Sequence, residues 1–256
     1  MSKYKKKIFI IGGSGLVGEV LVKKLLLKDY IVINIDNNLL KIKSKNYFFI
    51  KKDISNLKNI KKNFNIITRK IGCPDILVNC SYPNKFQIKN NSEFKKINFK
   101  SLEKNLNKHL GSYILTTTII LESMKKNKIA GSIVLFSSIY GIKAQDLSIY
   151  KNTNIKENPI YVVLKSGING FVKSAASYYG NYGININSIC PGGIEDKSDQ
   201  NFKLKKFTKA YKNKVPLKRF AKPDEIAECV LFLIDKDKSS YINGVNLAVD
   251  GGLSAI

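Results

Sequence analysis

The stretch Ile8-Phe-Ile-Ile11-Gly12-Gly-Ser-Gly15-Leu-Val-Gly18 decides the fold of this chain. Its four apolar residues predict a buried strand, its glycines a tight turn, and the amphipathic residues 16–28 a helix. Glycines in this position let the backbone approach a pyrophosphate, whose charge is stabilised at a helix N-terminus. The alternative is a tight turn without a ligand. The residues predicted to contact a dinucleotide here are Gly12, Ser14, Gly15, Leu16, Val17 and Gly18.

Apolar and amphipathic segments alternate along the rest of the chain. Strands are predicted over residues 31–35, 47–50, 75–79, 132–136, 184–189 and 245–249, and helices over 57–71, 102–126, 159–179 and 223–234. This alternation favours a parallel sheet covered by helices on both faces. No repeat or change in composition divides the chain. The prediction is therefore one α/β domain over residues 1–256, a doubly wound Rossmann fold with a mostly parallel seven-stranded sheet.

Composition narrows the class of protein. With 256 residues, 44% of them hydrophobic, the chain can bury a large core. No apolar run approaches the ~18–20 residues that span a bilayer, and no cleavage pattern follows the N-terminus. We therefore expect a cytoplasmic protein without a membrane partner. Four scattered cysteines and a single histidine, His109, supply too few ligands for a zinc site, so we predict no metal.

The formal net charge of +25 suggests nucleic-acid binding. However, Arg69 and Arg219 are the only arginines, and the lysines run through the whole chain. Nucleic-acid recognition favours arginines and a concentrated basic patch. We expect no specific nucleic-acid partner, although the positive field can attract an anionic substrate.

Tyr161-Val-Val-Leu-Lys165 pairs a phenol with an ammonium group. On a helix these side chains emerge on one face, about one turn apart. A lysine at about 4 Å would favour the phenolate by up to ~4 kcal/mol at an effective dielectric near ~20. That effect would bring the phenol pKa from about 10 close to neutrality. The hydroxyl of Ser138 could then hold a substrate carbonyl against the phenol. Taken alone, the motif is more often an ordinary surface pair.

Asp36 ends the second predicted strand, eighteen residues after Gly18. A carboxylate in this position binds ribose hydroxyls and repels an added 2′-phosphate. We therefore expect NAD(H) to be preferred over NADP(H). The alternative is a solvated acid in a loop.

Taken in order, these motifs resemble the short-chain dehydrogenase/reductase family over nearly the whole chain. Each motif is common alone, but their order and spacing are specific. The matching segments are Gly12–Gly18 as quoted above, Lys52-Asp53-Ile54, Leu77-Val-Asn79, Ser137-Ser138-Ile-Tyr-Gly141, Tyr161-Val-Val-Leu-Lys165, Asn187-Ser-Ile-Cys-Pro191-Gly192, Pro216-Leu-Lys-Arg219-Phe-Ala-Lys-Pro223-Asp-Glu225-Ile-Ala and Val249-Asp-Gly-Gly252.

The resemblance implies roles for particular residues. Tyr161 would be the general acid/base, Lys165 would lower its pKa and bind the nicotinamide ribose, and Ser138 would polarise the carbonyl. Asp53 would contact the adenine. Further cofactor contacts are implied for Ile54, Asn79, Pro191, Gly192 and Ile194. The family also implies a homotetramer or homodimer formed through the helices at 102–126 and 159–179.

The chain departs from the family pattern at several positions. The glycine turn is one residue tighter than usual, and Tyr82 stands where a glycine is expected. Asp196 replaces a threonine that contacts the nicotinamide amide. Lys108, flanked by Asn107 and His109, stands where an asparagine completes a proton relay. A helix irregularity could bring Asn107 or His109 into that relay; otherwise water must carry the proton.

The 22 residues between Ser138 and Tyr161 form a longer gap than is usual in the family. The extra polar segment, about 146–158, is expected to overhang the active site and suits a polyhydroxylated substrate. The alternative is a surface insertion without a role. Residues 195–214 are polar and lysine-rich, which favours a mobile lid.

These observations predict an NAD(H)-dependent oxidoreductase that interconverts a secondary alcohol and a ketone, on a sugar or sugar-derived substrate. The chain is similar to the branch associated with bacterial surface-sugar and flagellin modification. One alternative is a 3-oxoacyl-thioester reductase acting on an acidic acyl carrier protein. Another is a dinucleotide-binding scaffold without catalytic activity.

Overall fold

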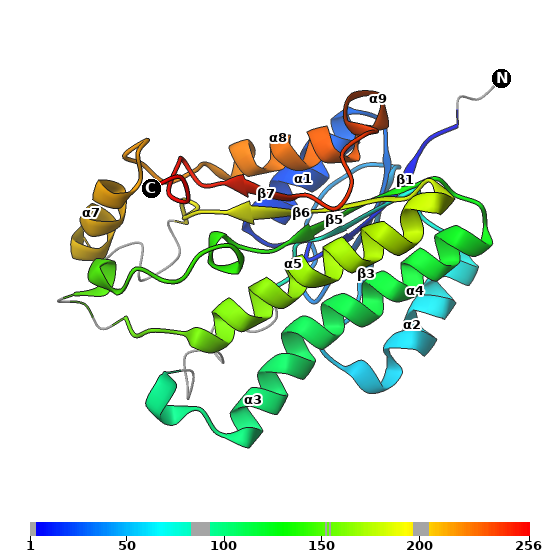
Figure 1. The fold of residues 1–256 in the computed structure, drawn as a ribbon. Coiled ribbons are helices and arrows are strands. Elements are labelled where there is room, and N and C mark those ends of the chain that lie inside the picture. Colours follow the sequence, from blue (N-terminus) through cyan, green and yellow to red (C-terminus); the bar gives the residue numbers. More distant parts are fainter. Residues whose placement is uncertain (1–3, 83–92, 152, 154, 197–204) are drawn as a thin grey trace.

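The computed structural model describes residues 4–82, 93–151, 153, 155–196 and 205–256. Its centre is a seven-stranded sheet in the order β3-β2-β1-β4-β5-β6-β7, with every neighbouring pair parallel (Figure 1). The strands are β1 (Lys7–Ile11), β2 (Ile31–Asp36), β3 (Tyr47–Lys51), β4 (Ile76–Asn79), β5 (Ser132–Phe136), β6 (Asn185–Pro191) and β7 (Asn246–Val249). The doubly wound α/β prediction is confirmed, and the sheet is wholly rather than mostly parallel.

Helices cover both faces of this sheet (Figure 1). α1 (Leu16–Leu27) and α8 (Pro223–Ile234), followed by α9 (Lys236–Ser239), lie on one face, and α2 (Ile60–Ile71), α4 (Ser112–Lys126) and α5 (Pro159–Tyr179) on the other. Alternate residues of β1 serve the two layers, because side chains alternate across a strand. Ile8 and Ile10 pack with α1 and α8, whereas Phe9 and Ile11 pack with the opposite layer. This explains why β1 is a continuous apolar run.

The carboxyl ends of β1 and β4 lie next to each other at the point where the strand order reverses. In open parallel sheets, ligands bind in the crevice outside this switch point. The glycine turn follows β1 directly, and the segment containing Cys80 and Tyr82 follows β4. The topology therefore brings these two segments to one site.

The single helix predicted over residues 102–126 is interrupted. α3 (Phe99–Asn105) leads into a π-helical stretch, Leu106–Gly111, before α4 begins. The hydroxyl of Ser112 donates to the carbonyl oxygens of Lys108 at 2.7 Å and His109 at 3.0 Å. Side-chain hydroxyls that bond to helix carbonyls favour such irregularities. The wider turn leaves Asn107 exposed and buries His109.

Two segments lie beyond the carboxyl ends of the strands. The insertion contains a short 3₁₀ turn, Leu147–Tyr150, and the predicted lid contains α7 (Lys205–Lys214). Residues 152 and 154 of the insertion and 197–204 of the lid lie outside the described residues. Among the helices that are described, none has the length and apolar character to cross a membrane.

Candidate active site

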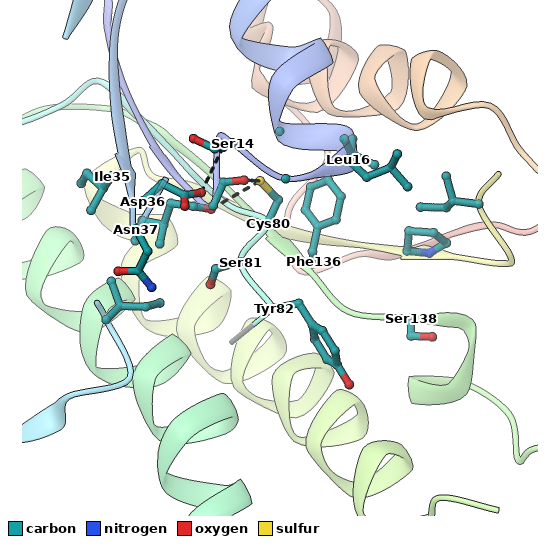
Figure 2. A pocket seen from close by; sticks show the side chains of 18 of the residues that line it. Ser14, Leu16, Ile35, Asp36, Asn37, Cys80, Ser81, Tyr82, Phe136 and Ser138 are labelled. Atoms are coloured by element: carbon teal, nitrogen blue, oxygen red, sulfur yellow. Dashed lines mark hydrogen bonds between the residues drawn. The ribbon is translucent and has the colours of Figure 1, made fainter. Parts of the chain in front are cut away.

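A cavity of about 690 Å³ runs along the carboxyl ends of the central strands. In Figure 2, Ser14 and Asp36 lie toward one end, and Tyr82 and Ser138 toward the other. The predicted residues that line it are Gly12, Ser14, Gly15, Leu16, Val17, Gly18, Asp36, Asp53, Ile54, Ser138, Tyr161, Lys165, Pro191, Gly192 and Ile194. Motifs from six separate parts of the sequence thus meet at one cavity.

The glycine turn has no room for a side chain at Gly12 or Gly18. A Cβ atom on Gly12, whose φ is +84°, would lie 2.5 Å from the Cα of Ser81. A Cβ on Gly18 would lie 2.2 Å from the carbonyl oxygen of Gly12. The N-cap of α1 is Gly15, which has no side chain to cap the first amides of the helix. An uncapped helix N-terminus beside a close-packed backbone turn fits the pyrophosphate of a dinucleotide.

Asp36 lies at the same end of the cavity and joins two loops. One carboxylate oxygen accepts from the amide of Ser14 and the other from the amide of Asn38, each at 3.0 Å. Asp53 and Ile54 line the cavity after β3. Lys52 also lines it, and its ammonium donates to the Oδ1 atom of Asn63 at 3.3 Å. This end of the cavity therefore carries acidic residues (Asp36 and Asp53) and a basic residue (Lys52) near the expected position of the adenosine.

Asn79 was predicted to contact the cofactor, but it is not among the residues that line the cavity. Its side chain is completely buried, and its Oδ1 atom accepts from the hydroxyl of Ser81 at 2.7 Å. Within the described chain, its Nδ2 atom has no hydrogen-bond partner. Side chains alternate across a strand, and the Asn79 side chain points into the protein interior. Through its bond with Ser81 it supports the segment that follows β4.

That segment supplies three lining residues that the sequence analysis did not assign to the cofactor: Cys80, Ser81 and Tyr82. The thiol of Cys80 donates to the carbonyl oxygens of Ile11 at 3.3 Å and Gly12 at 3.4 Å. Burial raises the pKa of this thiol to about 12, so it remains protonated as a donor. Through these two hydrogen bonds, Cys80 connects the start of the glycine turn to the segment that follows β4.

The N-terminus of α5 presents Tyr161 and Lys165 on one face, as predicted. Asn158 caps the helix by accepting from the amide of Tyr161 at 2.9 Å. The Nζ atom of Lys165 lies 5.7 Å from the ring centroids of Tyr82, Tyr113 and Tyr161. Phenol rings at this range attract an ammonium charge. Ser138 follows β5, and its Oγ atom accepts from the amide of Tyr140 at 3.2 Å.

The predicted lowering of the Tyr161 pKa is not found in this structure. Burial raises the pKa of Tyr161, and a hydrogen bond with Ser138 only partly opposes that effect. Burial also lowers the pKa of Lys165 to about 8. The Nζ atom of Lys165 lies 5.7 Å from the centroid of the Tyr161 ring and donates to the carbonyl oxygen of Phe136 at 2.9 Å. At neutral pH the site therefore holds a protonated phenol.

His109 is the residue that the π-helical stretch brings to the catalytic end. Its ring lies 5.2 Å from that of Tyr82, which in turn lies 5.9 Å from Tyr161. These rings and Lys165 line a small cavity of about 10 Å³, close to the space needed by one water molecule. Burial, followed by the charges of Lys165 and Lys108, lowers the pKa of His109 to about 4. The imidazole is therefore neutral at physiological pH.

Asp196 also lines the cavity and is 9% exposed. The resemblance placed this carboxylate where a threonine is usual, and the structure keeps it at the cavity wall.

Sequence alone offered no signal for two further aromatic residues near the catalytic end. Tyr113 donates its hydroxyl to the carbonyl oxygen of Ser81 at 2.7 Å, and the Tyr140 ring lies 6.4 Å from that of Tyr161.

Comparison with known protein families gives one match that covers most of the chain. A family model described as Enoyl-(Acyl carrier protein) reductase matches residues 34–254. A curated relative, the post-translational flagellin modification protein A of Campylobacter coli, is 30% identical and aligns with 96% of this chain and 97% of its own. The 3-oxoacyl-(acyl-carrier-protein) reductase of Buchnera aphidicola is 28% identical, with both chains fully covered.

A solved structure resembles the whole fold. The short chain dehydrogenase of Leptospira borgpetersenii, crystallised with bound NAD⁺, superposes with a TM-score of 0.85. It is 31% identical, and the match covers 98% of this chain and 93% of that one.

Proposed function

Since this chain belongs to the short-chain dehydrogenase/reductase family, an oxidoreductase family, we propose that it interconverts a secondary alcohol and a ketone with NAD(H). One observation carries the proposal. Ser138, Tyr161 and Lys165 line the same cavity as a glycine turn that has no room for a side chain at Gly12 or Gly18. A nicotinamide bound along this cavity would supply or accept the hydride.

The protein groups would then handle the oxygen and the proton. In the direction of reduction, the protonated phenol of Tyr161 donates its proton to the carbonyl oxygen as the alcohol forms. The hydroxyl of Ser138 donates a hydrogen bond to the same oxygen, while its own oxygen accepts from the Tyr140 amide. Lys165 holds a positive charge beneath the phenol. His109 and the small cavity beside it offer a route for proton resupply.

Support for NAD(H) over NADP(H) comes from Asp36. Its carboxylate lines the adenosine end and already accepts from the Ser14 amide, which fixes its position. A 2′-phosphate placed there would meet a like charge. The relative from Leptospira was crystallised with NAD⁺, which is consistent with the proposal.

The substrate class that we propose is a sugar or a sugar-derived ketone. Support comes from the polar insertion and from the similarity to a flagellin modification protein. A second candidate is a 3-oxoacyl thioester, favoured by the similarity to the Buchnera reductase and by the lysine-rich surface. A scaffold without activity is the weakest alternative, because the three side chains predicted to be catalytic all line one cavity.

We also propose that the protein forms a homodimer or homotetramer through α4 and α5. These helices expose Leu115 and Val163, which are 40% and 53% accessible in the single chain.

The test is a reduction assay with NADH on ketoses, keto-sugar phosphates and 3-oxoacyl thioesters. Tyr161→Phe should abolish turnover on the accepted substrate and leave NADH binding within about twofold, because the ring is kept and only the proton donor is lost. Unimpaired turnover in this variant would overturn the mechanism. Turnover of thioesters with NADPH alone would favour the second candidate.

A further inference from the structure

The insertion reaches the catalytic end through a pair of tyrosines. The hydroxyl oxygen of Tyr150, in the turn Leu147–Tyr150, lies 3.3 Å from that of Tyr140. Tyr140 contacts both predicted catalytic groups on that side. Its amide donates to the Oγ atom of Ser138, and its ring meets that of Tyr161 edge-on at 6.4 Å and 79°. The position of Tyr140 therefore affects the placement of both groups.

Tyr150 is held from its other side by α7. Its ring stacks on that of Phe207 at 6.1 Å and 11°. Asp146, at the start of the same turn, forms an ion pair with Lys214 at the end of α7 at 3.0 Å. Between them, Ile149 is 3% exposed and belongs to a buried cluster with Tyr211, Val215, Phe220 and Leu253. Figure 1 shows α7 beside the turn.

The same helix contacts the opposite wall of the cavity. The hydroxyl of Tyr211 accepts from the amide of Gly193, which follows the lining residue Gly192. The ring of Tyr211 stacks on Phe220 at 4.5 Å and 19°. A Cβ atom on Gly193 would lie 2.7 Å from Phe220, so the turn and the rings are closely packed. α7 thus links the end of β6 to the insertion.

We propose that Tyr150 is a positioning residue: it couples α7 to Tyr140 and so fixes Ser138 and Tyr161 relative to the substrate. The insertion is then a structural part of the catalytic centre and not a surface decoration. The inference deepens the proposed function, because its kinetic test uses the same reduction. The half-buried ring stack and the hydroxyl pair are separate contacts, so their contributions can be separated by substitution.

Three variants test this role against a matched control. Tyr150→Ala removes the stack and the hydroxyl, Tyr150→Phe keeps the stack, and Tyr140→Phe removes the other half of the hydroxyl pair. The control is Leu147→Ala, in the same turn but 53% exposed. We expect Tyr150→Ala to lower kcat by roughly tenfold or more through misplacement, with the Kd for NADH within about twofold. Tyr150→Phe should recover part of that loss.

A double-mutant cycle identifies the hydroxyl contact. If the two phenols act together, Tyr140→Phe combined with Tyr150→Phe should lower kcat no further than the worse single variant. Additive losses, or equal losses in Leu147→Ala, would overturn the positioning role. Equal losses of NADH affinity and kcat would point to general damage and would also overturn it.

A second measurement does not depend on turnover. Hydrogen exchange of the amides of residues 205–214 should become faster in Tyr150→Ala and remain as in the wild type in Tyr150→Phe and Leu147→Ala. Unchanged exchange in Tyr150→Ala would refute the coupling. If the wild type reduces none of the carbonyl compounds, the proposed function fails, while the exchange result still decides whether Tyr150 holds α7.

Discussion

The Nζ atom of Lys165 donates a hydrogen bond to the carbonyl oxygen of Phe136, the last residue of β5, at 2.9 Å. This bond ties the first turns of α5 to the end of the central sheet, and the lysine side chain is only 6% exposed. A buried ammonium with one carbonyl acceptor and three phenol rings around it is incompletely compensated for the loss of water. Lys165, the predicted partner of Tyr161, is therefore held in place at a cost in stability.

That cost predicts a stabilising substitution. Burial lowers the pKa of Lys165 from 10.5 to about 8, so at neutral pH the folded protein holds this proton less tightly than the unfolded chain. Lys165→Met should raise the free energy of unfolding at pH 7 by up to about 3 kcal/mol and abolish activity. The gain should shrink as the pH rises from 8 towards 10.5. Urea unfolding at pH 7 and pH 10 measures it, with the exposed Lys173→Met as control; a gain independent of pH would contradict the prediction.

His109 should titrate far below an ordinary histidine. Burial lowers its pKa from 6.5 to about 4, so the unfolded chain takes up this proton first as the pH falls. Stability should therefore decrease between about pH 6.5 and 4, and His109→Gln should reduce that decrease. Because the chain has one histidine, its imidazole proton resonance is a single unambiguous signal. A titration midpoint near 6.5 would show that the ring is not buried as described.

The raised pKa of Tyr161 predicts different pH profiles for the two directions of the proposed reaction. Reduction needs the protonated phenol and should keep a constant kcat/KM from about pH 6 to 7.5, below the pKa of about 8 at which Lys165 loses its charge. Oxidation needs the phenolate and should increase with pH over the same range. The measurement is kcat/KM in both directions on one substrate pair. A reduction rate that already declines at pH 7 would mean that the phenol pKa is lowered in the working enzyme.

Cofactor choice should respond to the charge of Asp36. Asp36→Asn removes the charge and keeps an acceptor for the Ser14 amide, so affinity for NADPH should rise about tenfold relative to NADH. Fluorescence titration with both cofactors measures this ratio, and Glu19→Gln on α1 is the control. Wild-type protein that binds NADPH more tightly would reverse the assignment and favour the acyl-thioester candidate. Protein that binds neither would favour the scaffold.

Two glycine substitutions should have opposite effects. Gly18→Ala places a Cβ 2.2 Å from the carbonyl oxygen of Gly12 and should lower both stability and NADH affinity. Gly170→Ala, inside α5, meets nothing within 4 Å and should stabilise the protein by about 0.5–1 kcal/mol. Thermal unfolding and NADH titration compare them. If Gly18→Ala binds NADH normally, the close approach of the turn is not needed for the cofactor.

The sequence predicted features that depend on local pattern. The apolar run of β1 and its glycine turn identified the cofactor end, and a four-residue spacing was enough to place Tyr161 and Lys165 on one face. Asn79 stays a predicted cofactor contact; its buried side chain does not line the cavity and instead accepts from the Ser81 hydroxyl. The predicted phenol pKa was wrong in direction because burial of Tyr161 raises it, and that burial depends on how distant segments pack.

Features that depend on contacts between distant segments could not be predicted. A helix irregularity near Asn107 and His109 was one of the two alternatives that the sequence offered, but its π-helical form, with the Ser112 hydroxyl bonded to two backbone carbonyl oxygens, does not follow from the residue types. The stack between Tyr150 and Phe207 joins residues that no sequence spacing relates. Such contacts become visible only when the chain is folded.

The pairing of the insertion with α7 has a consequence for protein engineering. Among the described residues, the turn Leu147–Tyr150 pairs with no strand, so it could be exchanged without altering the sheet. However, Tyr150 stacks on Phe207 and Asp146 pairs with Lys214. A graft of residues 146–158 into a related scaffold would therefore have to carry residues 205–214 with it. The two segments behave as one transferable unit, although they are far apart in the gene.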